Sequence, residues 1–375
     1  MGGDCLAVHE GKTVFIEGAI PGEEVEVRIL QEKKDILRAR VSRVIKPSPD
    51  RVEPVCPHTS HCGGCQYQHM RYEEELAQKE FQVREVIKRA LGFDAVGSIV
   101  CGPKEYGYRR SATFHTVPQG RGKAPRFSYI GKDNITPVIL KQCDLLDPAI
   151  QKMITHAPLG ATGKFSFKMA SSGKLVTDQK ESFFRVNLSG KTFLAHSQSF
   201  FQNNWEVTEK MAALVREWTE DAMPDVFFDL YAGVGTFTFL AAENTGRVIA
   251  IEENHQAVSA LRMNREEMNW KKLEVVENRV ERAFQAVWKK AGTERSLVLF
   301  DPPRAGLDRG LCDFLASEVR AQRLIYISCD PATLARDLKI LIEGGNYELA
   351  SVVPFDMFPR TKHVEAATLL IYKGS

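Results

Sequence analysis

Long apolar runs are missing from this sequence of 375 residues. Its longest apolar stretches, such as Ser296–Phe300 and Leu324–Ile327, have the length of a β-strand, whereas a membrane-spanning helix needs about 20 apolar residues. The first residues, Met-Gly-Gly-Asp-Cys, also lack the basic and then apolar stretch of a secretory signal. Low-complexity tracts are absent as well. We therefore expect a globular, cytoplasmic protein with no membrane partner.

A strong net charge is also missing, because the chain carries only +2 at neutral pH. The charge is nevertheless unevenly distributed. Residues 101–200 carry 15 basic and 6 acidic side chains, residues 1–100 carry 14 and 16, and residues 201–375 carry 21 and 26. The basic middle segment indicates either a surface that faces phosphates or a solvated lysine-rich face. Charge alone does not distinguish these two interpretations.

The length exceeds what one hydrophobic core holds, so two or three domains are expected. Residues 1–48 alternate in polarity over Thr13–Glu17, Glu24–Leu30 and Ile36–Val44, with turn residues between the first two stretches. This pattern predicts a small β-meander or barrel. The segment Pro47-Ser48-Pro49 then serves as a linker.

The predicted secondary structure changes twice after this linker. Residues 73–91 have helical spacing that ends at Gly92, and residues 105–200 contain short β-like stretches. From residue 207 onward, helices alternate with apolar strands. The predicted helices are 254–268, 280–291, 309–319 and 331–343, and the predicted strands are Val226–Leu230, Arg247–Glu252, Leu273–Val276, Ser296–Phe300 and Leu324–Ser328. Such alternation predicts a parallel sheet covered on both faces, with ligands at the carboxyl ends of its strands.

Candidate ligand-binding residues follow or end three of these predicted strands. Gly233 and Gly235 follow the first strand, where they allow close approach of a ligand to the backbone, although the third glycine of the dinucleotide fingerprint is missing. Glu252 ends the second strand and can bind the two hydroxyls of a ribose. Asp301 ends the fourth strand and begins the stiff loop Asp-Pro-Pro-Arg. The layout fits a Rossmann-like methyltransferase and also a nucleotide-binding dehydrogenase.

Two further residues are candidates for catalysis. Cys329 follows the fifth strand and precedes a helix, whose N-terminus should lower the pKa of the thiol. Glu365 lies just before the apolar stretch 366–371. Taken alone, Cys329 fits a buried core thiol and Glu365 fits a solvated carboxylate at a strand start.

Four cysteines have the spacing of a metal site. Cys56, Cys62 and Cys65 form C-x5-C-x2-C, and Cys143 lies far downstream. In a reducing compartment such thiols suggest metal binding before disulfides. Their spacing is compatible with structural zinc and with a [4Fe–4S] cluster.

Together these features make the sequence resemble the bacterial RNA 5-methyluridine methyltransferases, and more narrowly their 23S ribosomal RNA branch. The resemblance covers nearly the whole chain. It is carried by Gly18–Glu23, by the four cysteines, and by the segments Phe200–Asn204, Ser328–Thr333 and His363–Glu365.

The resemblance implies three domains. Residues 1–48 would form a TRAM domain, an OB-like β-barrel that binds RNA, and residues 49–199 a β-rich central domain with a [4Fe–4S] cluster on Cys56, Cys62, Cys65 and Cys143. Residues 200–375 would form an α/β, Rossmann-like methyltransferase domain. By the same resemblance, S-adenosyl-L-methionine is bound by Gln202, Tyr231, Thr236, Glu252, Asn278 and Asp301.

The chemistry implied by this resemblance explains the two catalytic candidates. Carbon 5 of uracil is a weak nucleophile until a thiolate adds to carbon 6, which is the expected role of Cys329. A base must then remove the proton from carbon 5, which is the expected role of Glu365. The target uridine must leave its stack to reach the thiol.

Several related enzymes are excluded by what the loop after the fourth strand contains. RNA 5-methylcytosine enzymes have a cysteine in the loop that is Asp301–Arg304 here, and amino-group methyltransferases have an aromatic residue where Arg304 stands. The transfer RNA branch is expected to lack both the TRAM domain and the cluster, so 23S ribosomal RNA is the predicted substrate. The enzyme is also predicted to be a monomer. Two alternatives remain, a transfer RNA 5-methyluridine methyltransferase and a non-catalytic RNA-binding factor in ribosome assembly.

Overall fold

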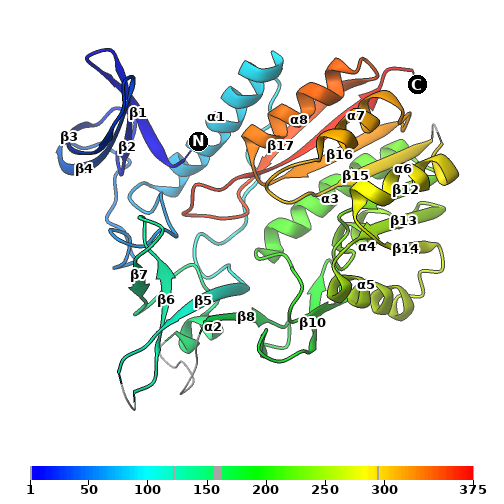
Figure 1. Cartoon of the computed structure of the whole chain (residues 1–375), viewed down its shortest axis with the longest axis horizontal. Helices are drawn as coiled ribbons and strands as arrows, with labels where there is room; N and C mark the ends of the chain where they lie inside the picture. Colours follow the sequence, from blue (N-terminus) through cyan, green and yellow to red (C-terminus); the bar gives the residue numbers. More distant parts are fainter. Residues whose placement is uncertain (1, 121–122, 155–162, 294, 375) are drawn as a thin grey trace.

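The computed structural model of the chain describes residues 2–120, 123–154, 163–293 and 295–374. In Figure 1 an N-terminal sheet lies at the upper left, a middle region lies below it, and a large sheet with its helices forms the right-hand part. Within these described ranges, no helix has both the length and the apolar character needed to cross a membrane.

The N-terminal region is an open sheet. Its four strands run in the order β1-β2-β4-β3, and they are β1 (Asp4–His9), β2 (Lys12–Glu17), β3 (Glu24–Glu32) and β4 (Ile36–Lys46). The predicted β structure is confirmed, but the closed OB-like barrel is not found. Closure requires the edge strands to pair, and no ladder joins β1 to β3 among the described residues.

The C-terminal region is built on a seven-stranded sheet in the order β14-β13-β12-β15-β16-β18-β17. Five strands are parallel and agree with the prediction to within one residue: β12 (Val226–Leu230), β13 (Arg247–Glu252), β14 (Leu273–Glu277), β15 (Ser296–Phe300) and β16 (Arg323–Ser328). The last two strands are β17 (Tyr347–Phe355) and β18 (Glu365–Tyr372), and β18 runs antiparallel to both of its neighbours, β16 and β17. The predicted parallel strands are confirmed, and β18 runs the other way because a short loop rather than a crossover helix joins it to β17.

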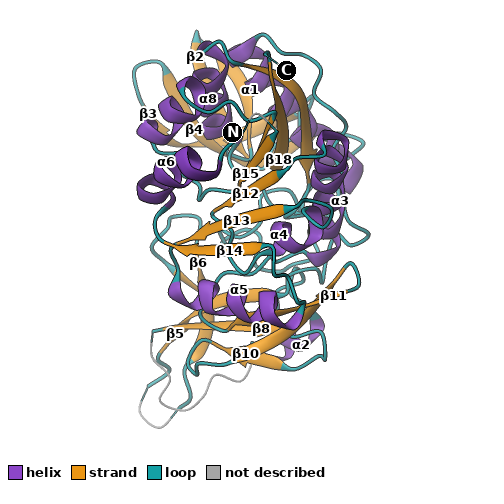
Figure 2. Ribbon diagram, turned by 90° about the vertical axis from the view of Figure 1, so that its right-hand side faces the viewer, coloured by secondary structure: helices purple, strands orange, loops and turns teal. Residues whose placement is uncertain are grey.

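Helices cover both faces of this sheet, as predicted. One face packs on α3 (Trp205–Ala222), α4 (Thr236–Ala241) and α5 (His255–Glu267). The other packs on α1 (Tyr72–Leu91), α6 (Val280–Ala291), α7 (Arg309–Ser317) and α8 (Pro331–Glu343). Figure 2 shows α3 and α4 on one side of the strands and α6 and α8 on the other. Neighbouring strand residues alternate between the two cores, with Phe227 in one and Phe228 in the other, as the period of two in a strand requires.

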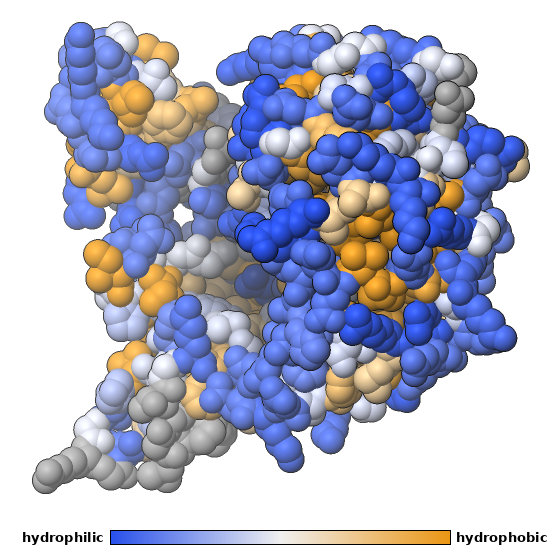
Figure 3. Space-filling model, turned by 45° about the vertical axis from the view of Figure 1, so that its right-hand side comes forward, coloured by the Kyte–Doolittle hydropathy of each residue, from blue (hydrophilic) through white to orange (hydrophobic). Residues whose placement is uncertain are grey.

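The middle region is rich in β structure, as predicted. A five-stranded sheet runs β7-β6-β5-β8-β9. Its strands are β5 (Ser111–Val117), β6 (Arg126–Ile130), β7 (Pro137–Ile139), β8 (Lys164–Met169) and β9 (Leu175–Thr177), and the short helix α2 (Pro148–Met153) and the hairpin of β10 (Phe183–Leu188) and β11 (Lys191–His196) complete the region. Figure 3 shows a hollow between the column formed by the N-terminal and middle regions and the block that contains the large sheet.

Candidate active site and cysteine cavity

The register of the large sheet brings Cys329 next to Glu365. Ser328, the last residue of β16, pairs with Ala366 of the antiparallel strand β18. Cys329 follows this pair on one strand and Glu365 precedes it on the other, so both lie at the same end of the β16–β18 ladder, and the charge of Glu365 acts on the Cys329 thiol. Asp301 follows β15, the other neighbour of β16. Three side chains predicted from separate motifs thus meet at the carboxyl edge of the sheet.

Burial raises the pKa of all three of these groups. It raises the pKa of Glu365 to about 7, an effect that the Arg304 guanidinium partly offsets. It holds the pKa of Asp301 well above its usual range, and the charges of Glu365 and Asp229 add to this. It raises the pKa of the Cys329 thiol to about 11, again with a contribution from Glu365. The site therefore favours neutral, protonated groups before substrate binds.

The predicted lowering of the Cys329 pKa by the following helix was wrong. Helix α8 begins after Asp330, whose carboxylate accepts hydrogen bonds from Ala332 N and Thr333 N (both 3.0 Å). A negative charge therefore occupies the helix N-terminus beside the thiol. The amide groups that would stabilise a thiolate already have a partner.

Arg304 is the residue of this site that sequence reasoning missed. Its guanidinium lies 3.2 Å from Nδ1 of His363, and its positive charge lowers the pKa of both Cys329 and Glu365. Its place in the loop after Asp301 at the ligand edge of the sheet was the available signal, but we had used Arg304 only to exclude other enzymes.

The glycine turn and the acid of the predicted donor site also meet. Gly233 and Gly235 have positive φ angles of 57° and 87°. The Glu252 carboxylate accepts hydrogen bonds from Gly233 N (2.9 Å) and Asn254 N (2.8 Å), and Asn278 N donates to the Glu252 carbonyl (3.0 Å). This arrangement fixes Glu252 and Asn278 side by side next to the turn.

The remaining predicted donor residues are placed around this turn. Tyr231 has a φ of 63°, and its hydroxyl donates to Glu281 of α6 (2.8 Å). Thr236 is the first residue of α4 and is 7% exposed. Gln202 is 8% exposed and precedes α3, which packs beside α4. The backbone N–H of Asp301 donates to the carbonyl of Leu230, directly before Tyr231.

The four cysteines of the predicted cluster line one cavity. Burial raises the pKa of Cys65 and of Cys143 to about 12, and each thiol is affected by others of the set. The described part of the chain holds no group of three or more His, Cys, Asp or Glu side chains arranged to bind a single metal ion.

Polar groups without hydrogen-bond partners face the same cavity. They are Nε of Arg109 and the hydroxyl of Tyr129, each buried, and the side chain of Gln68 hydrogen-bonds the Cys65 thiol in the same cavity. Buried donors are ordinarily satisfied. The cavity is thus lined by four thiols and by donors suited to a negatively charged occupant.

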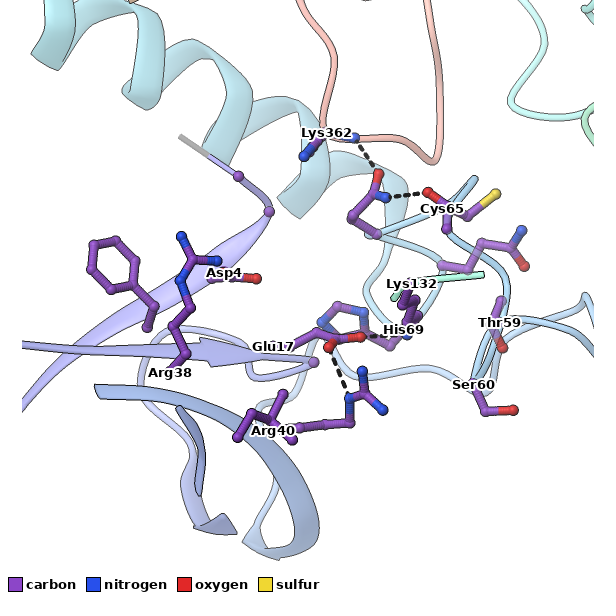
Figure 4. A pocket seen from close by; sticks show the side chains of 18 of the residues that line it. Asp4, Glu17, Arg38, Arg40, Thr59, Ser60, Cys65, His69, Lys132 and Lys362 are labelled. Carbon is purple, nitrogen blue, oxygen red and sulfur yellow. Dashed lines mark hydrogen bonds and ion pairs between the residues drawn. The ribbon is translucent and has the colours of Figure 1, made fainter. Parts of the chain in front are cut away.

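A larger cavity of about 550 Å³ lies between the N-terminal sheet and the loop that carries Cys56, Cys62 and Cys65. We call this loop, residues 56–68, the cysteine loop. Figure 4 shows its basic side chains Arg38, Arg40, Lys132 and Lys362 together with the acid Glu17. Glu17 binds both Arg40 (2.8 Å) and Lys132 (2.5 Å). This cavity contains none of the residues of the carboxyl edge.

Comparison with known proteins assigns two parts of the chain. The family model described as tRNA (Uracil-5-)-methyltransferase matches residues 168–373. The TRAM domain model matches residues 2–42, the open N-terminal sheet.

Several relatives match over almost their whole length. The 23S rRNA (uracil(1939)-C(5))-methyltransferase RlmD of Pectobacterium atrosepticum is 29% identical over 99% of this chain and 91% of its own. An uncharacterized RNA methyltransferase of Treponema denticola is 30% identical over 99% of this chain and 96% of its own.

A solved structure shares the fold. It is the tRNA (uracil-54, C5)-methyltransferase of Pyrococcus abyssi in complex with S-adenosyl-L-homocysteine, which has a TM-score of 0.72, is 23% identical, and covers 99% of this chain and 98% of its own. An enzyme that acts on transfer RNA thus has the same fold over its whole length. We predicted that the transfer RNA branch lacks both the TRAM domain and the cluster; this neighbour covers the N-terminal sheet as well, and the cluster part of that prediction is not tested.

Proposed function

The chain belongs to the tRNA (uracil-5-)-methyltransferase family, and from this premise we propose that its substrate is a uridine of 23S ribosomal RNA. The enzyme methylates carbon 5 of uracil with S-adenosyl-L-methionine as donor. The ribosomal substrate is supported by relatives that are named for it and match over more than nine-tenths of both chains. Transfer RNA is the second candidate, because the Pyrococcus abyssi enzyme has the same fold.

We propose that Cys329 is the nucleophile. Its sulfur adds to carbon 6 of the uracil, and the electron pair of the carbon 5–carbon 6 double bond moves toward the carbonyl oxygen on carbon 4. Carbon 5 then attacks the methyl group of the donor. The bond between that methyl group and the donor sulfur breaks, and S-adenosyl-L-homocysteine leaves. The thiol gives up its proton before it attacks. Burial raises the pKa of this thiol and so opposes the thiolate, whereas the positive charge of Arg304 favours it.

Glu365 completes the reaction in this proposal. It lies with Cys329 at one end of the β16–β18 ladder, and its raised pKa of about 7 suits a general base near neutral pH. It takes the proton from carbon 5, the double bond to carbon 6 forms again, and the Cys329 sulfur leaves. The product is 5-methyluridine.

We propose that the turn after β12 and the ends of β13, β14 and β15 hold the donor. The Glu252 carboxylate is fixed by two backbone amides, so its free lone pairs are oriented to accept bonds from ribose hydroxyls. Bound S-adenosyl-L-methionine supplies the electrophilic methyl group. The other residues proposed for this site are Gln202, Tyr231, Thr236, Asn278 and Asp301.

We propose that Cys56, Cys62, Cys65 and Cys143 hold a [4Fe–4S] cluster. The residues fit this group, because all four thiols line one cavity into which unpartnered donors also face. Hydrogen bonds from such donors stabilise a negatively charged cluster. A cubane is larger than a single ion, so its ligands stand further apart than those of zinc. When bound, the cluster would serve as a scaffold, since methyl transfer moves no net electrons.

The chain divides, in this proposal, into three modules. The TRAM sheet at about 1–48 contacts RNA, the middle region at about 49–199 supplies the cluster and the basic surface, and residues 200–375 catalyse the reaction. Helix α1 lies within the middle segment of the sequence but packs on α8, so the modules are joined by more than their linkers.

Two substitutions test the roles of the catalytic residues. Cys329→Ala should abolish methylation, because it removes the sulfur that attacks carbon 6. Glu365→Gln should form the covalent RNA adduct but not release it. Both outcomes are read from denaturing gels of labelled RNA and from the yield of 5-methyluridine. Methylation by Cys329→Ala protein would contradict the mechanism.

The substrate is tested by mapping 5-methyluridine in cells with and without this gene. Loss of a modified site in 23S ribosomal RNA supports the proposal, and loss only in transfer RNA replaces it with the second candidate. No loss in either RNA, together with no binding of S-adenosyl-L-methionine by the purified protein, would favour a non-catalytic RNA-binding factor.

The cluster is tested by absorption. Protein purified without oxygen should be brown, with broad absorption near 400 nm and about four iron atoms per chain, as a [4Fe–4S] cluster requires. Cys143→Ser should lose this absorption, whereas Cys312→Ser, a buried thiol in α7, should keep it. A colourless protein containing zinc would disprove the cluster.

A further inference from the structure

The loop of residues 356–364 delivers the proposed base to the active site. It joins β17 to β18, and strand pairing resumes only at Glu365, which is opposite Phe355. The sheet therefore fixes the backbone position at which β18 begins. The orientation of the Glu365 side chain depends in addition on the conformation of the preceding loop. A base displaced by about 1 Å loses much of its effect on the rate.

Arg360 is the central anchor of this loop. It is 5% exposed and has a φ of 68°, a conformation that a non-glycine residue keeps only when its surroundings hold it. Its backbone N–H donates to Glu75 (2.7 Å), and its guanidinium donates to the carbonyl of Met70 (2.8 Å). The guanidinium also lies 5.2 Å from the ring centroids of Tyr72 and Tyr106.

The cysteine loop binds the same segment directly. Gln66 N and Tyr67 N, which follow Cys65 in the chain, both donate to the Arg360 carbonyl (3.2 Å each). The side chain of Gln66 accepts from Lys362 N (3.0 Å) and donates to the carbonyl of Gly63 (2.8 Å). Figure 4 shows Lys362 on its loop above the segment that carries Cys65. Three hydrogen bonds thus join the cysteine loop to a point a few residues before Glu365.

The nucleophile is not held in this way. Cys329 lies between β16 and α8, whose positions come from the sheet and from the cap of Asp330. A change in the cysteine loop would therefore move the base relative to the thiol. Only the steps that need Glu365 would be affected.

We propose that Gln66 and Arg360 are positioning residues for Glu365, through which the cysteine loop controls the removal of the carbon 5 proton. This inference rests on the proposed function, because it assumes that Glu365 is the base. It predicts that disturbing these contacts separates two measurable steps, adduct formation by Cys329 and adduct release by Glu365.

The test is Gln66→Ala, which removes the side-chain contacts to Lys362 N and Gly63. We expect covalent RNA adduct to form at the native rate and to decay 10- to 100-fold more slowly, so that adduct accumulates during turnover. Both rates are measured by rapid quench and denaturing gels with labelled RNA. Absorption near 400 nm and the melting temperature report whether the cysteine site and the fold are intact.

Two further variants complete the experiment. Arg360→Lys keeps a positive charge near Glu75 but loses the planar contacts with the tyrosine rings, and it should show the same separation of rates. Gln78→Ala removes an amide on α1 that donates to Glu74 (2.8 Å) and should behave as the native protein.

The outcomes distinguish this inference from the proposed function. Unchanged adduct decay in Gln66→Ala and Arg360→Lys, or equal slowing of formation and decay, overturns the positioning role. If one of these variants does not fold, the other decides. If the native protein forms no adduct at all, the proposed mechanism itself fails, whatever the variants do.

Discussion

At the scale of single residues, the active site concentrates acidic groups where little water reaches them. Burial raises the pKa of Asp301, Cys329 and Glu365, and the nearby positive charge of Arg304 opposes this only in part. Such groups disfavour the folded state when they ionise. The same burial gives Glu365 a pKa suited to its proposed role.

This burial predicts how stability depends on pH. The pKa of Glu365 is raised from 4.5 to about 7 in the folded protein, so the folded state holds a proton that the unfolded state has released between these values. The penalty is absent below pH 4.5, grows as pH rises and is complete above 7. Glu365→Gln should therefore raise the free energy of unfolding at pH 8, by at most about 3 kcal/mol, and should change it little at pH 4.5.

Chemical denaturation at both pH values measures this effect. The exposed carboxylate Glu253, replaced by Gln, is the control and should show no such pH dependence. An equal effect of Glu365→Gln at pH 4.5 and pH 8 would mean that the pKa of Glu365 is not raised.

At the scale of elements, buried charges attach α1 to the loop of residues 356–364, which leads to the proposed base Glu365 and is called the catalytic loop below. Lys79 is fully buried and donates to Glu75 (2.7 Å), to Asp356 (2.6 Å) and to the carbonyl of Phe358 (3.1 Å). The hydroxyl of Tyr72 donates to the same Asp356 (2.6 Å). A helix that precedes the catalytic domain by more than a hundred residues thus fixes the start of the loop that leads to Glu365.

The buried lysine provides a prediction for this contact. Lys79→Met should lower the free energy of unfolding by about 3–5 kcal/mol, because it leaves the buried carboxylate of Asp356 without its lysine and leaves Arg360 (3.5 Å) as the cation beside buried Glu75. Lys88→Met is the matched control on the same helix, since Lys88 pairs with Asp94 (2.9 Å) while half exposed, and should cost less than about 1 kcal/mol. Denaturant unfolding measures both, and similar values for the two variants would refute the role of the buried network.

At the scale of the whole molecule, the N-terminal sheet, the cysteine loop and the catalytic loop meet around the cavity of about 550 Å³. Gly3 lies so close to Gln66 that a Cβ there would stand 2.8 Å from that side chain. The basic residues of the cavity come from the N-terminal sheet (Arg38 and Arg40), the middle region (Lys132) and the loop of residues 356–364 (Lys362). RNA bound at this cavity would therefore contact the TRAM sheet and that loop together.

This arrangement predicts an electrostatic contribution from Arg38, which lies over the Phe15 ring. Arg38→Gln should weaken RNA binding at low salt and reduce the slope of log affinity against log salt by about 0.7–0.9, the value for one phosphate contact. Filter binding at several salt concentrations measures the slope. Lys12→Gln, whose lysine pairs with Glu32 (2.5 Å), is the control, and an equal slope for Arg38→Gln and native protein would contradict the contact.

Much of the fold followed from local patterns. The period of apolar residues predicted the five parallel strands and the helices between them, because buried strands and amphipathic helices impose different spacings on the sequence. The motifs placed Glu252, Asp301 and Cys329 at strand ends, and parallel strands bring such ends to one edge. The chemistry of the site was therefore accessible before any coordinates.

Other features depended on contacts between distant segments. The sequence did not predict that β18 runs antiparallel to its neighbours or that the N-terminal strands leave their edges unpaired, since each depends on which surfaces meet. It left open whether the helix at 73–91 packs on the last domain, and this helix, α1, packs on α8. It predicted a lowered pKa for Cys329, but the surrounding protein raises it.

The sequence by itself indicated the proposed nucleophile and base, the glycine turn and the four cysteines, because each is a residue type at a motif position. Only the tertiary structure brought Glu365 and Cys329 to one end of the β16–β18 ladder, Arg304 near both, and Arg360 against the cysteine loop. The physical reason is that pKa values and side-chain positions depend on burial and on charges brought near by folding, and segments nearly 300 residues apart supply them here.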